Sequence, residues 1–301
     1  MSQANSVKSI IYALVANFAI AIAKLVAAFI TNSGSMMAES IHSFADCGNQ
    51  GLLLLGVKNA KRPPDLKHPL GYGKTVYFWS FIVAIMLFSM GGLFSIYEGS
   101  HKLHETDGLS SPLIAIGVLV FAIVAESLSL AGCVREINKV RGNRSYFRWF
   151  KETRQSELMV IFGEDIAALL GLVFALLAVT LTMITGNPLY DALGSIVIGI
   201  LLLIIAILIG KEVKEMIIGQ GVETPKYDAM ISLLNEQESI DEVYNLLTLQ
   251  LGSDVMVAIK ARMAPQPSDT DLIHAINKCE EKFRDAFPEV VWCFFEPDIK
   301  D

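Results

Sequence analysis

Long apolar runs fill the first two thirds of the chain. A helix needs about 20 residues to cross roughly 30 Å of hydrocarbon. Six runs are long enough, and they lie at 8–30, 36–58, 75–101, 112–136, 157–185 and 189–211. The pattern predicts a membrane-embedded, all-α bundle of six transmembrane helices over residues 1–221.

The pattern changes after Gly221. It predicts a helix over 225–237, two alternating strands over 242–251 and 254–263, a second helix over 269–286 and a last strand over 290–296. The order αββαβ is typical of a small α+β, ferredoxin-like domain with its helices on one face of a three-stranded sheet. We expect this domain to occupy residues 222–301. The exposed edge of its sheet favours pairing with a second copy of the chain.

Composition supports a membrane protein. Of the 301 residues, 53% are hydrophobic and only 18% are charged, whereas soluble proteins carry charge on about one residue in four. The net charge of −7 is unevenly spread, because residues 1–222 contain 15 acidic and 17 basic residues and residues 223–301 contain 16 and 7. The sequence has no basic stripe that could bind the phosphates of a nucleic acid. We therefore expect the chain to be embedded in a bilayer and not to bind nucleic acid.

Orientation follows from the loops. Lys and Arg gather after the second and fourth apolar runs, whereas 31–35 and 185–189 contain none. Positive residues are retained on the cytoplasmic side of a membrane. We therefore expect a multi-pass protein of the plasma (inner) membrane with both termini in the cytoplasm.

A few ionisable residues interrupt the apolar runs. A charge in lipid is costly unless it is paired or hydrated, so such residues are functional candidates. The second run places four polar side chains on one helical face, at offsets 0, +3, +7 and +10: Glu39, His42, Asp46 and Asn49. The fifth run adds the adjacent acids Glu164 and Asp165.

One imidazole and two or three carboxylates are a ligand set that Zn²⁺ accepts in tetrahedral geometry. The spacing of His42 and Asp46 at i and i+4 lets both reach one small ion beside the helix. A hydrogen-bonded pair between helices, without metal, is the alternative interpretation of the same residues.

Three further acidic residues in or beside the apolar runs are functional candidates. Glu126, in the fourth run, is either a proton-carrying carboxylate or the partner of Lys24. Glu39 is a second candidate for carrying protons. Asp191 either guides cations at the outer end of the sixth run or caps its own helix.

With these residues identified, the chain resembles the cation diffusion facilitator family of metal exporters. Four blocks carry the resemblance in order: GSMMAESIHSFAD at 34–46, HPLGYGKTVYFWS at 68–80, IYEG at 96–99 and GNPLYDALGSIVIG at 186–199. The resemblance implies six spans, a cytoplasmic C-terminal domain and a homodimer. It also implies export of cytoplasmic divalent metal in exchange for protons, with the metal as cargo and no organic cofactor.

The resemblance extends to individual residues. His42, Asp46 and Asp165 match the family's ligands, whereas Ile161 stands where many zinc-transporting members have histidine. Glu164 beside Asp165 is similar to the branch related to the ninth human zinc transporter subfamily and is a candidate for the fourth ligand. Such an oxygen-rich set weakens discrimination of Zn²⁺ from Mn²⁺, Fe²⁺ or Co²⁺.

An auxiliary metal site found in some members maps to Asp65 and His68, but Tyr72 stands where a further histidine is expected.

Two other functional classes fit the same buried residues. An intramembrane metalloenzyme would use the metal to activate water, although the sequence lacks HExxH and GxGD motifs and a separate general base. A metal-gated channel would pass cations without proton counterflow. The sequence favours the proton-coupled exporter.

Overall fold

The computed structural model describes residues 3–104 and 109–300, with side chains described from Asn17 onward. The chain divides into two units. The helical unit comprises the chain up to Leu55, Trp79–Tyr146 and Glu157–Glu212, and the C-terminal unit comprises Gly56–Phe78, Phe147–Ser156 and the chain from Val213 onward. The domain boundary expected between residues 221 and 222 stays a prediction.

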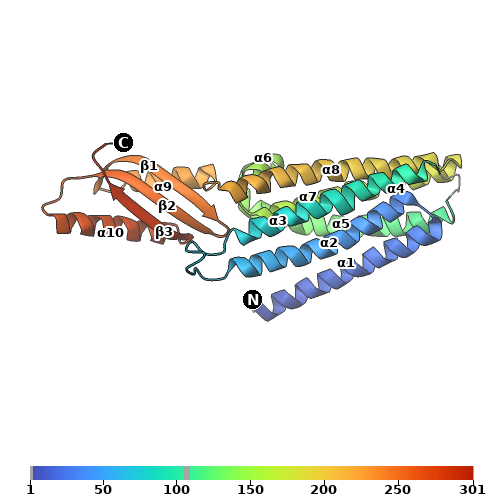
Figure 1. Cartoon of the computed structure of the whole chain (residues 1–301), viewed down its shortest axis with the longest axis horizontal. Helices are drawn as coiled ribbons and strands as arrows, with labels where there is room; N and C mark the ends of the chain where they lie inside the picture. The colour runs from blue at the N-terminus through green and yellow to red at the C-terminus, as the bar shows by residue number, and fades with distance from the viewer. Residues whose placement is uncertain (1–2, 105–108, 301) are drawn as a thin grey trace. The chain divides into compact units, whose positions relative to one another are not determined.

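Long helices make up the helical unit. They are α1 (Gln3–Thr31), α2 (Gly34–Ala60), α3 (Thr75–Met86), the π-helical segment η1 (Leu87–Leu93), α4 (Phe94–Lys102), α5 (Pro112–Val140), α7 (Ser156–Thr185) and α8 (Leu189–Ile218). They run side by side along one bundle (Figure 1).

Four helical stretches in the described residues are long and apolar enough to cross a membrane: Thr75–Lys102, Pro112–Val140, Ser156–Thr185 and Leu189–Ile218. At 1.5 Å per residue, helices of 28 to 30 residues exceed the hydrocarbon thickness. The protein is therefore an integral membrane protein. The apolar part of α1 with described side chains, Asn17–Thr31, is shorter, and α2 carries the polar residues described below, so a membrane-spanning role for α1 and α2 stays a prediction.

The run at 75–101 is one helical stretch interrupted by a π-helical turn. Within it, Ser95 Oγ donates a hydrogen bond to Gly91 O at 2.6 Å, and Ser89 Oγ donates to Ile85 O at 2.8 Å. These hydroxyls satisfy carbonyls in and beside the widened turn. Single π turns are rare and often lie at functional sites.

The helix α8 packs closely on this interrupted stretch. A Cβ atom at Gly199 would lie 2.7 Å from Gly92 O and 2.8 Å from Ile96 N. Only glycine at this position allows the two backbones to approach so closely.

The C-terminal unit contains the short helix α6 (Tyr146–Glu152), most of which belongs to it, and the elements α9 (Thr224–Asn235), β1 (Ile240–Leu251), β2 (Asp254–Met263), α10 (Asp269–Ala286) and β3 (Val290–Pro297). The predicted order αββαβ is confirmed. The sheet order is β1-β2-β3, with β1 antiparallel and β3 parallel to β2.

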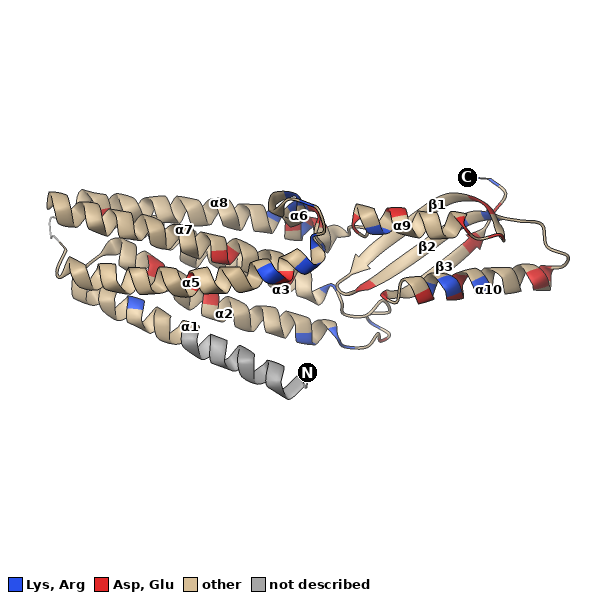
Figure 2. Cartoon of the chain, turned by 180° about the vertical axis from the view of Figure 1, so that it is seen from behind, with Lys and Arg blue, Asp and Glu red and all other residues tan. Residues whose placement is uncertain are grey.

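Alternation along the strands builds the core of this unit. Val255, Val257 and Ile259 of β2 are buried with Met230 of α9 and Phe283 of α10. Because side chains on one face of a strand recur every second residue, both helices cover the same face of the sheet. Charged residues are dense on α9 and α10 and sparse along the bundle helices (Figure 2).

Asp191 holds the first turn of α2. Its carboxylate, on the first turn of α8, accepts hydrogen bonds from Ser33 Oγ at 2.7 Å, from Gly34 N at 2.6 Å, and from Ser35 Oγ. The first backbone N–H groups of a helix have no partner within the helix. The sequence suggested that Asp191 caps its own helix; the structure instead places the cap on α2, 157 residues earlier in the chain.

We expect Asp191→Ala to destabilise the bundle, because the substitution leaves buried donors of α2 unsatisfied. Hydrogen bonds to a charged acceptor contribute about 2 kcal/mol, so the free energy of unfolding in detergent should fall by about that amount. Asp191→Asn, which keeps one acceptor oxygen, should lose less. Glu136→Ala, at an exposed ion pair on α5, is the control. Equal stability of Asp191→Ala and the control would contradict this role.

Candidate metal site

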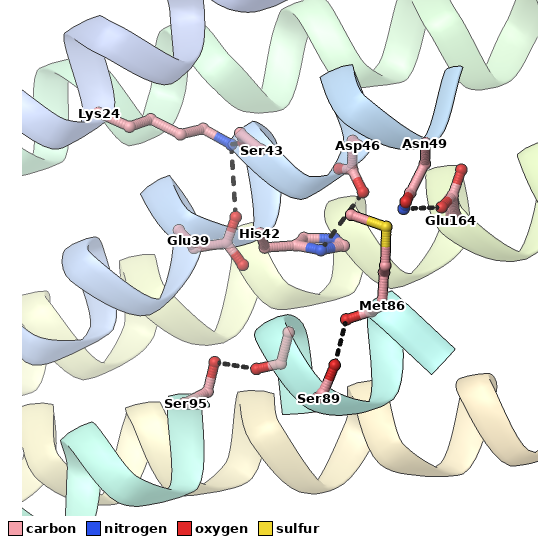
Figure 3. A network of polar contacts seen from close by, with 11 residues as sticks. Lys24, Glu39, His42, Ser43, Asp46, Asn49, Met86, Ser89, Ser95 and Glu164 are labelled. Carbon is pink, nitrogen blue, oxygen red and sulfur yellow. Dashed lines mark hydrogen bonds and ion pairs between the residues drawn. The ribbon is translucent and has the colours of Figure 1, made fainter. Parts of the chain in front are cut away.

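The polar face of α2 lies inside the bundle. Glu39, His42 and Asn49 are fully buried, and the side chain of Asp46 is 15% exposed. The predicted offsets therefore place all four residues together, as Figure 3 shows. Local helical geometry alone accounts for this arrangement, because residues three, four and seven apart share a face.

His42 and Asp46 form the centre of the candidate site. His42 Nδ1 lies 3.5 Å from Asp46 Oδ1. Among the described residues, neither ring nitrogen of His42 has a hydrogen-bond partner, and Asp46 Oδ1 accepts no hydrogen bond. Most buried polar atoms in proteins are hydrogen-bonded, so these three atoms, two of which meet only in the 3.5 Å ion-pair contact, need an explanation. Metal coordination is one, since it requires free lone pairs on nitrogen and oxygen.

The helix α7 brings two carboxylates to the same region. Glu164 Oε1 accepts a hydrogen bond from Asn49 Nδ2 at 2.6 Å, and Asp165 Oδ1 accepts one from Ser129 Oγ at 3.3 Å. Asp165 Oδ2 has no hydrogen-bond partner within the described part of the chain. Each carboxylate is thus held by one oxygen, and Asp165 keeps the other available.

In this conformation the ligands do not converge. Within residues 3–104 and 109–300, no group of three or more His, Cys, Asp or Glu side chains is close enough together to hold a metal ion. The predicted set of His42, Asp46, Asp165 and Glu164 therefore stays a proposal. A metal held by all four would require α2 and α7 side chains to move closer together.

Lys24 is the cation beside this face. Its ammonium nitrogen is fully buried, lies 3.4 Å from Glu39 Oε2 and donates a hydrogen bond to Ser43 Oγ at 2.7 Å. The sequence left Glu126 as either a proton carrier or the partner of Lys24. The structure gives Lys24 a different ion-pair partner, the carboxylate of Glu39. Gly171 of α7 packs against the same group, because an added Cβ atom would collide with Glu39 Oε1.

The π-helical turn η1 lies beside the imidazole. A Cβ atom at Gly91 would lie 3.9 Å from His42 Nδ1, and Met86 lies next to His42 and Asp46 in Figure 3. This π turn was not predicted from the sequence. The serines at 89 and 95, four residues after the carbonyls they bind, are the signal that was available.

The loop residues Asp65 and His68 belong to the C-terminal unit and are exposed. Asp65 Oδ1 accepts hydrogen bonds from Lys67 N and His68 N, and its other oxygen accepts one from Tyr72 Oη at 2.6 Å. The Tyr72 hydroxyl is the main reason why the pKa of Asp65 falls to about 2. Both carboxylate oxygens already hold the turn, which favours a structural role. The auxiliary metal site stays a prediction.

Known proteins resemble this chain in sequence. The family model of the cation efflux transmembrane domain matches residues 10–218. The human protein named proton-coupled zinc antiporter SLC30A9, mitochondrial, is 34% identical over 231 residues, which is 76% of this chain and 41% of that protein.

Two further relatives come from a plant and a bacterium. Metal tolerance protein C4 of Arabidopsis thaliana is 29% identical over 253 residues, which is 82% of this chain and 55% of that protein. Magnetosome protein MamB of Magnetospirillum gryphiswaldense is 24% identical over 280 residues, 92% of this chain and 88% of that protein.

The chain spans about half, or less, of the length of the human and plant relatives. The family model nevertheless covers more than two thirds of the chain, including every helix that carries a candidate ligand. The chain therefore belongs to the cation efflux family, the cation diffusion facilitators.

Proposed function

We propose that the protein exports a divalent transition-metal cation from the cytoplasm in exchange for protons, and that Zn²⁺ is its cargo. The observation that carries this proposal is that both nitrogens of His42 and one oxygen each of Asp46 and Asp165 are buried in the bundle without a hydrogen-bond partner among the described residues. The name of the human relative, a proton-coupled zinc antiporter, adds support. Mn²⁺, Fe²⁺ and Co²⁺ are alternative cargoes, because the carboxylates outnumber the imidazole.

The proposed mechanism follows from competition at these atoms. Imidazole and carboxylate bind a metal ion only in their deprotonated forms, so metal binding releases protons and protonation releases metal. Protons arriving from the more acidic side displace the cation there, and the protonated site then returns to the cytoplasm. Glu126 and Glu39 are the proposed proton carriers near the site. Glu39 is neutralised by Lys24, which leaves Glu126 as the less restrained of the two.

The proposed topology has six spans, including α1 and α2, with both termini in the cytoplasm. The Lys and Arg residues after α2 and around α6 support this orientation. The plasma (inner) membrane is the proposed location, whereas the human relative is named a mitochondrial protein.

We also propose that the protein is a homodimer whose C-terminal sheets face each other. The face of the sheet opposite α9 and α10 carries two cross-strand rows of mainly apolar residues: Leu247, Ala258 and Phe294, and Leu249, Met256 and Trp292. Leu247 is 61% exposed and Phe294 is 55% exposed. Exposed apolar patches of this kind mark interaction surfaces, and an identical patch on a second copy would bury it.

Transport in proteoliposomes tests the main proposal. Vesicles with an acidic lumen should take up Zn²⁺ faster than vesicles without a pH gradient, as reported by a trapped zinc-sensitive dye. Uptake should fall by about 10-fold or more in Asp165→Ala, since removing one ligand or its support typically costs 10- to 100-fold.

The control for this assay is Glu136→Ala, on the surface of α5, which should transport normally. Uptake that ignores both the pH gradient and Asp165→Ala would contradict the proposal. Cation flux that depends on Asp165 without proton movement would indicate a channel instead.

A double variant of the sheet face tests the dimer. We expect the wild-type protein in detergent to have the mass of two chains, and Leu247→Glu combined with Phe294→Asp to have the mass of one, because four charges would meet in the apolar interface. The matched control is Ile273→Glu, which changes an apolar residue of α10 that is 57% exposed. Light scattering measures the mass. A monomeric wild type, or a double variant that stays dimeric, would refute the interface.

A further inference from the structure

The helix α5 has the most exposed surface of the four stretches that are long and apolar enough to cross a membrane. Of its most apolar 18 residues, 17% are buried, against 39–44% in the other three stretches. Ile114, Phe121 and Leu128 lie seven residues apart and are all exposed, so they form one outward stripe along the helix. In a membrane, such a stripe is covered by acyl chains or by another protein.

The outward stripe ends in basic residues. Arg135 follows Leu128 by seven residues, Lys139 lies one turn further, and both side chains are exposed. Arg135 therefore lies about 10 Å beyond Leu128 along the helix axis. Basic residues gather at the end of α5 that leads into α6 (Figure 2). The stripe thus passes from apolar to basic in the way that a phospholipid passes from acyl chain to phosphate.

The place of these basic residues needs a separate explanation from their number. Retention of Lys and Arg on the cytoplasmic side explains why they follow a span. It does not explain why Arg135 and Lys139 still lie within α5, on its outward stripe. Residues 135–144 contain four basic residues and one acidic residue, a net charge of +3. Clusters of this size beside a span attract anionic lipids.

The other two basic residues of this cluster hold the end of the helix. Arg141 Nε donates a hydrogen bond to Asn138 Oδ1 at 2.5 Å, and Arg144 Nε donates one to Arg141 O at 2.9 Å. The guanidinium of Arg141 lies 4.6 Å from the centre of the Tyr146 ring. Tyrosine rings are enriched at the level of the lipid headgroups. These contacts fix an aromatic ring and two positive charges beside the basic end of the stripe.

Lys139 has only a weakly held partner. Its ammonium nitrogen lies 2.6 Å from Glu136 Oε1, and both side chains are more than half exposed. Exposed ion pairs contribute little to stability, so Lys139 can exchange this carboxylate for a phosphate at small cost. A second copy of the chain fits the stripe less well, because a two-fold interface would bring the basic ends of two α5 helices together.

We propose that the outward stripe of α5 binds an anionic phospholipid, with an acyl chain along Phe121 and Leu128 and the phosphate at Arg135 and Lys139. The inference goes beyond the proposed transport and does not depend on the cargo. It also has a consequence for the candidate metal site. Ser129 of the same helix donates a hydrogen bond to Asp165, so a lipid that fixes α5 supports the position of this carboxylate.

Native mass spectrometry of the purified full-length protein, with phosphatidylglycerol or phosphatidylcholine added, tests this surface. The wild type should retain more phosphatidylglycerol than phosphatidylcholine. Arg135→Gln and Lys139→Gln should each lower the retention of phosphatidylglycerol by about fivefold, and together by more, because each removes one cation from the headgroup level. Retention of phosphatidylcholine should not change. Arg135→Lys, which keeps the charge, should retain more phosphatidylglycerol than Arg135→Gln.

The matched control is Lys278→Gln combined with Arg284→Gln, which removes the same charge from exposed positions of α10 and should bind lipid as the wild type does. Equal retention of the two lipids by the wild type, or an equal loss in this control, would overturn the lipid surface. So would wild-type retention of phosphatidylglycerol in the folded single and double α5 variants, with folding checked by thermal unfolding. A changed mass of the double α5 variant in light scattering would instead identify the stripe as a contact between copies.

Discussion

The cost of placing ionisable groups in an apolar bundle is the constraint on which this structure depends. A charge or polar atom removed from water must be paired, or it destabilises the fold. Most such groups here have a partner: Lys24 pairs with Glu39, Asn49 with Glu164, and Asp191 with the first turn of α2. Among the described residues, several of the buried polar atoms without a hydrogen-bond partner lie on the polar face of α2 and on α7, and they include both ring nitrogens of His42, Oδ1 of Asp46 and Oδ2 of Asp165.

The hydrogen-bonded and ion-paired groups fix the position of α2, which carries His42 and Asp46. Asp191 fixes the start of α2 to α8, and Lys24 fixes its next turns to α1. These contacts hold the backbone of α2, so that His42 and Asp46 keep their places although their contact with each other is an ion pair and not a hydrogen bond. On the other side of the imidazole lies the π-helical turn η1, whose backbone hydrogen bonds are already irregular. The site is therefore held by α1, α2 and α8 and bordered by a less regular helix.

Local information predicted much of this arrangement. The apolar runs predicted the helices because each run is longer than a membrane is thick, and strand alternation predicted the order of the C-terminal elements. The cluster on α2 was predictable because its four residues lie within 11 positions of one helix. Glu164 and Asp165 were identified by their charge alone.

Contacts between distant parts of the chain could not be predicted. Asp191 binds Gly34, 157 positions away, so the sequence suggested a cap on its own helix and could not reveal the cap on α2. Glu126 was considered as the partner of Lys24, and only the packing of α1 against α2 shows that Glu39 is closer. The close approach of Gly199 to Gly92 in the π turn is a tertiary contact, which a local pattern does not encode.

Proton release on metal binding is the most direct test of the central claim that cations and protons compete for these buried atoms. Zn²⁺ added to the purified protein in weak buffer should release protons, measured with a pH indicator, because the bound forms of imidazole and carboxylate are deprotonated. The number released per bound Zn²⁺ should fall in His42→Ala and Asp165→Ala. Stoichiometric Zn²⁺ binding without any proton release, across the pH range in which transport occurs, would contradict the account.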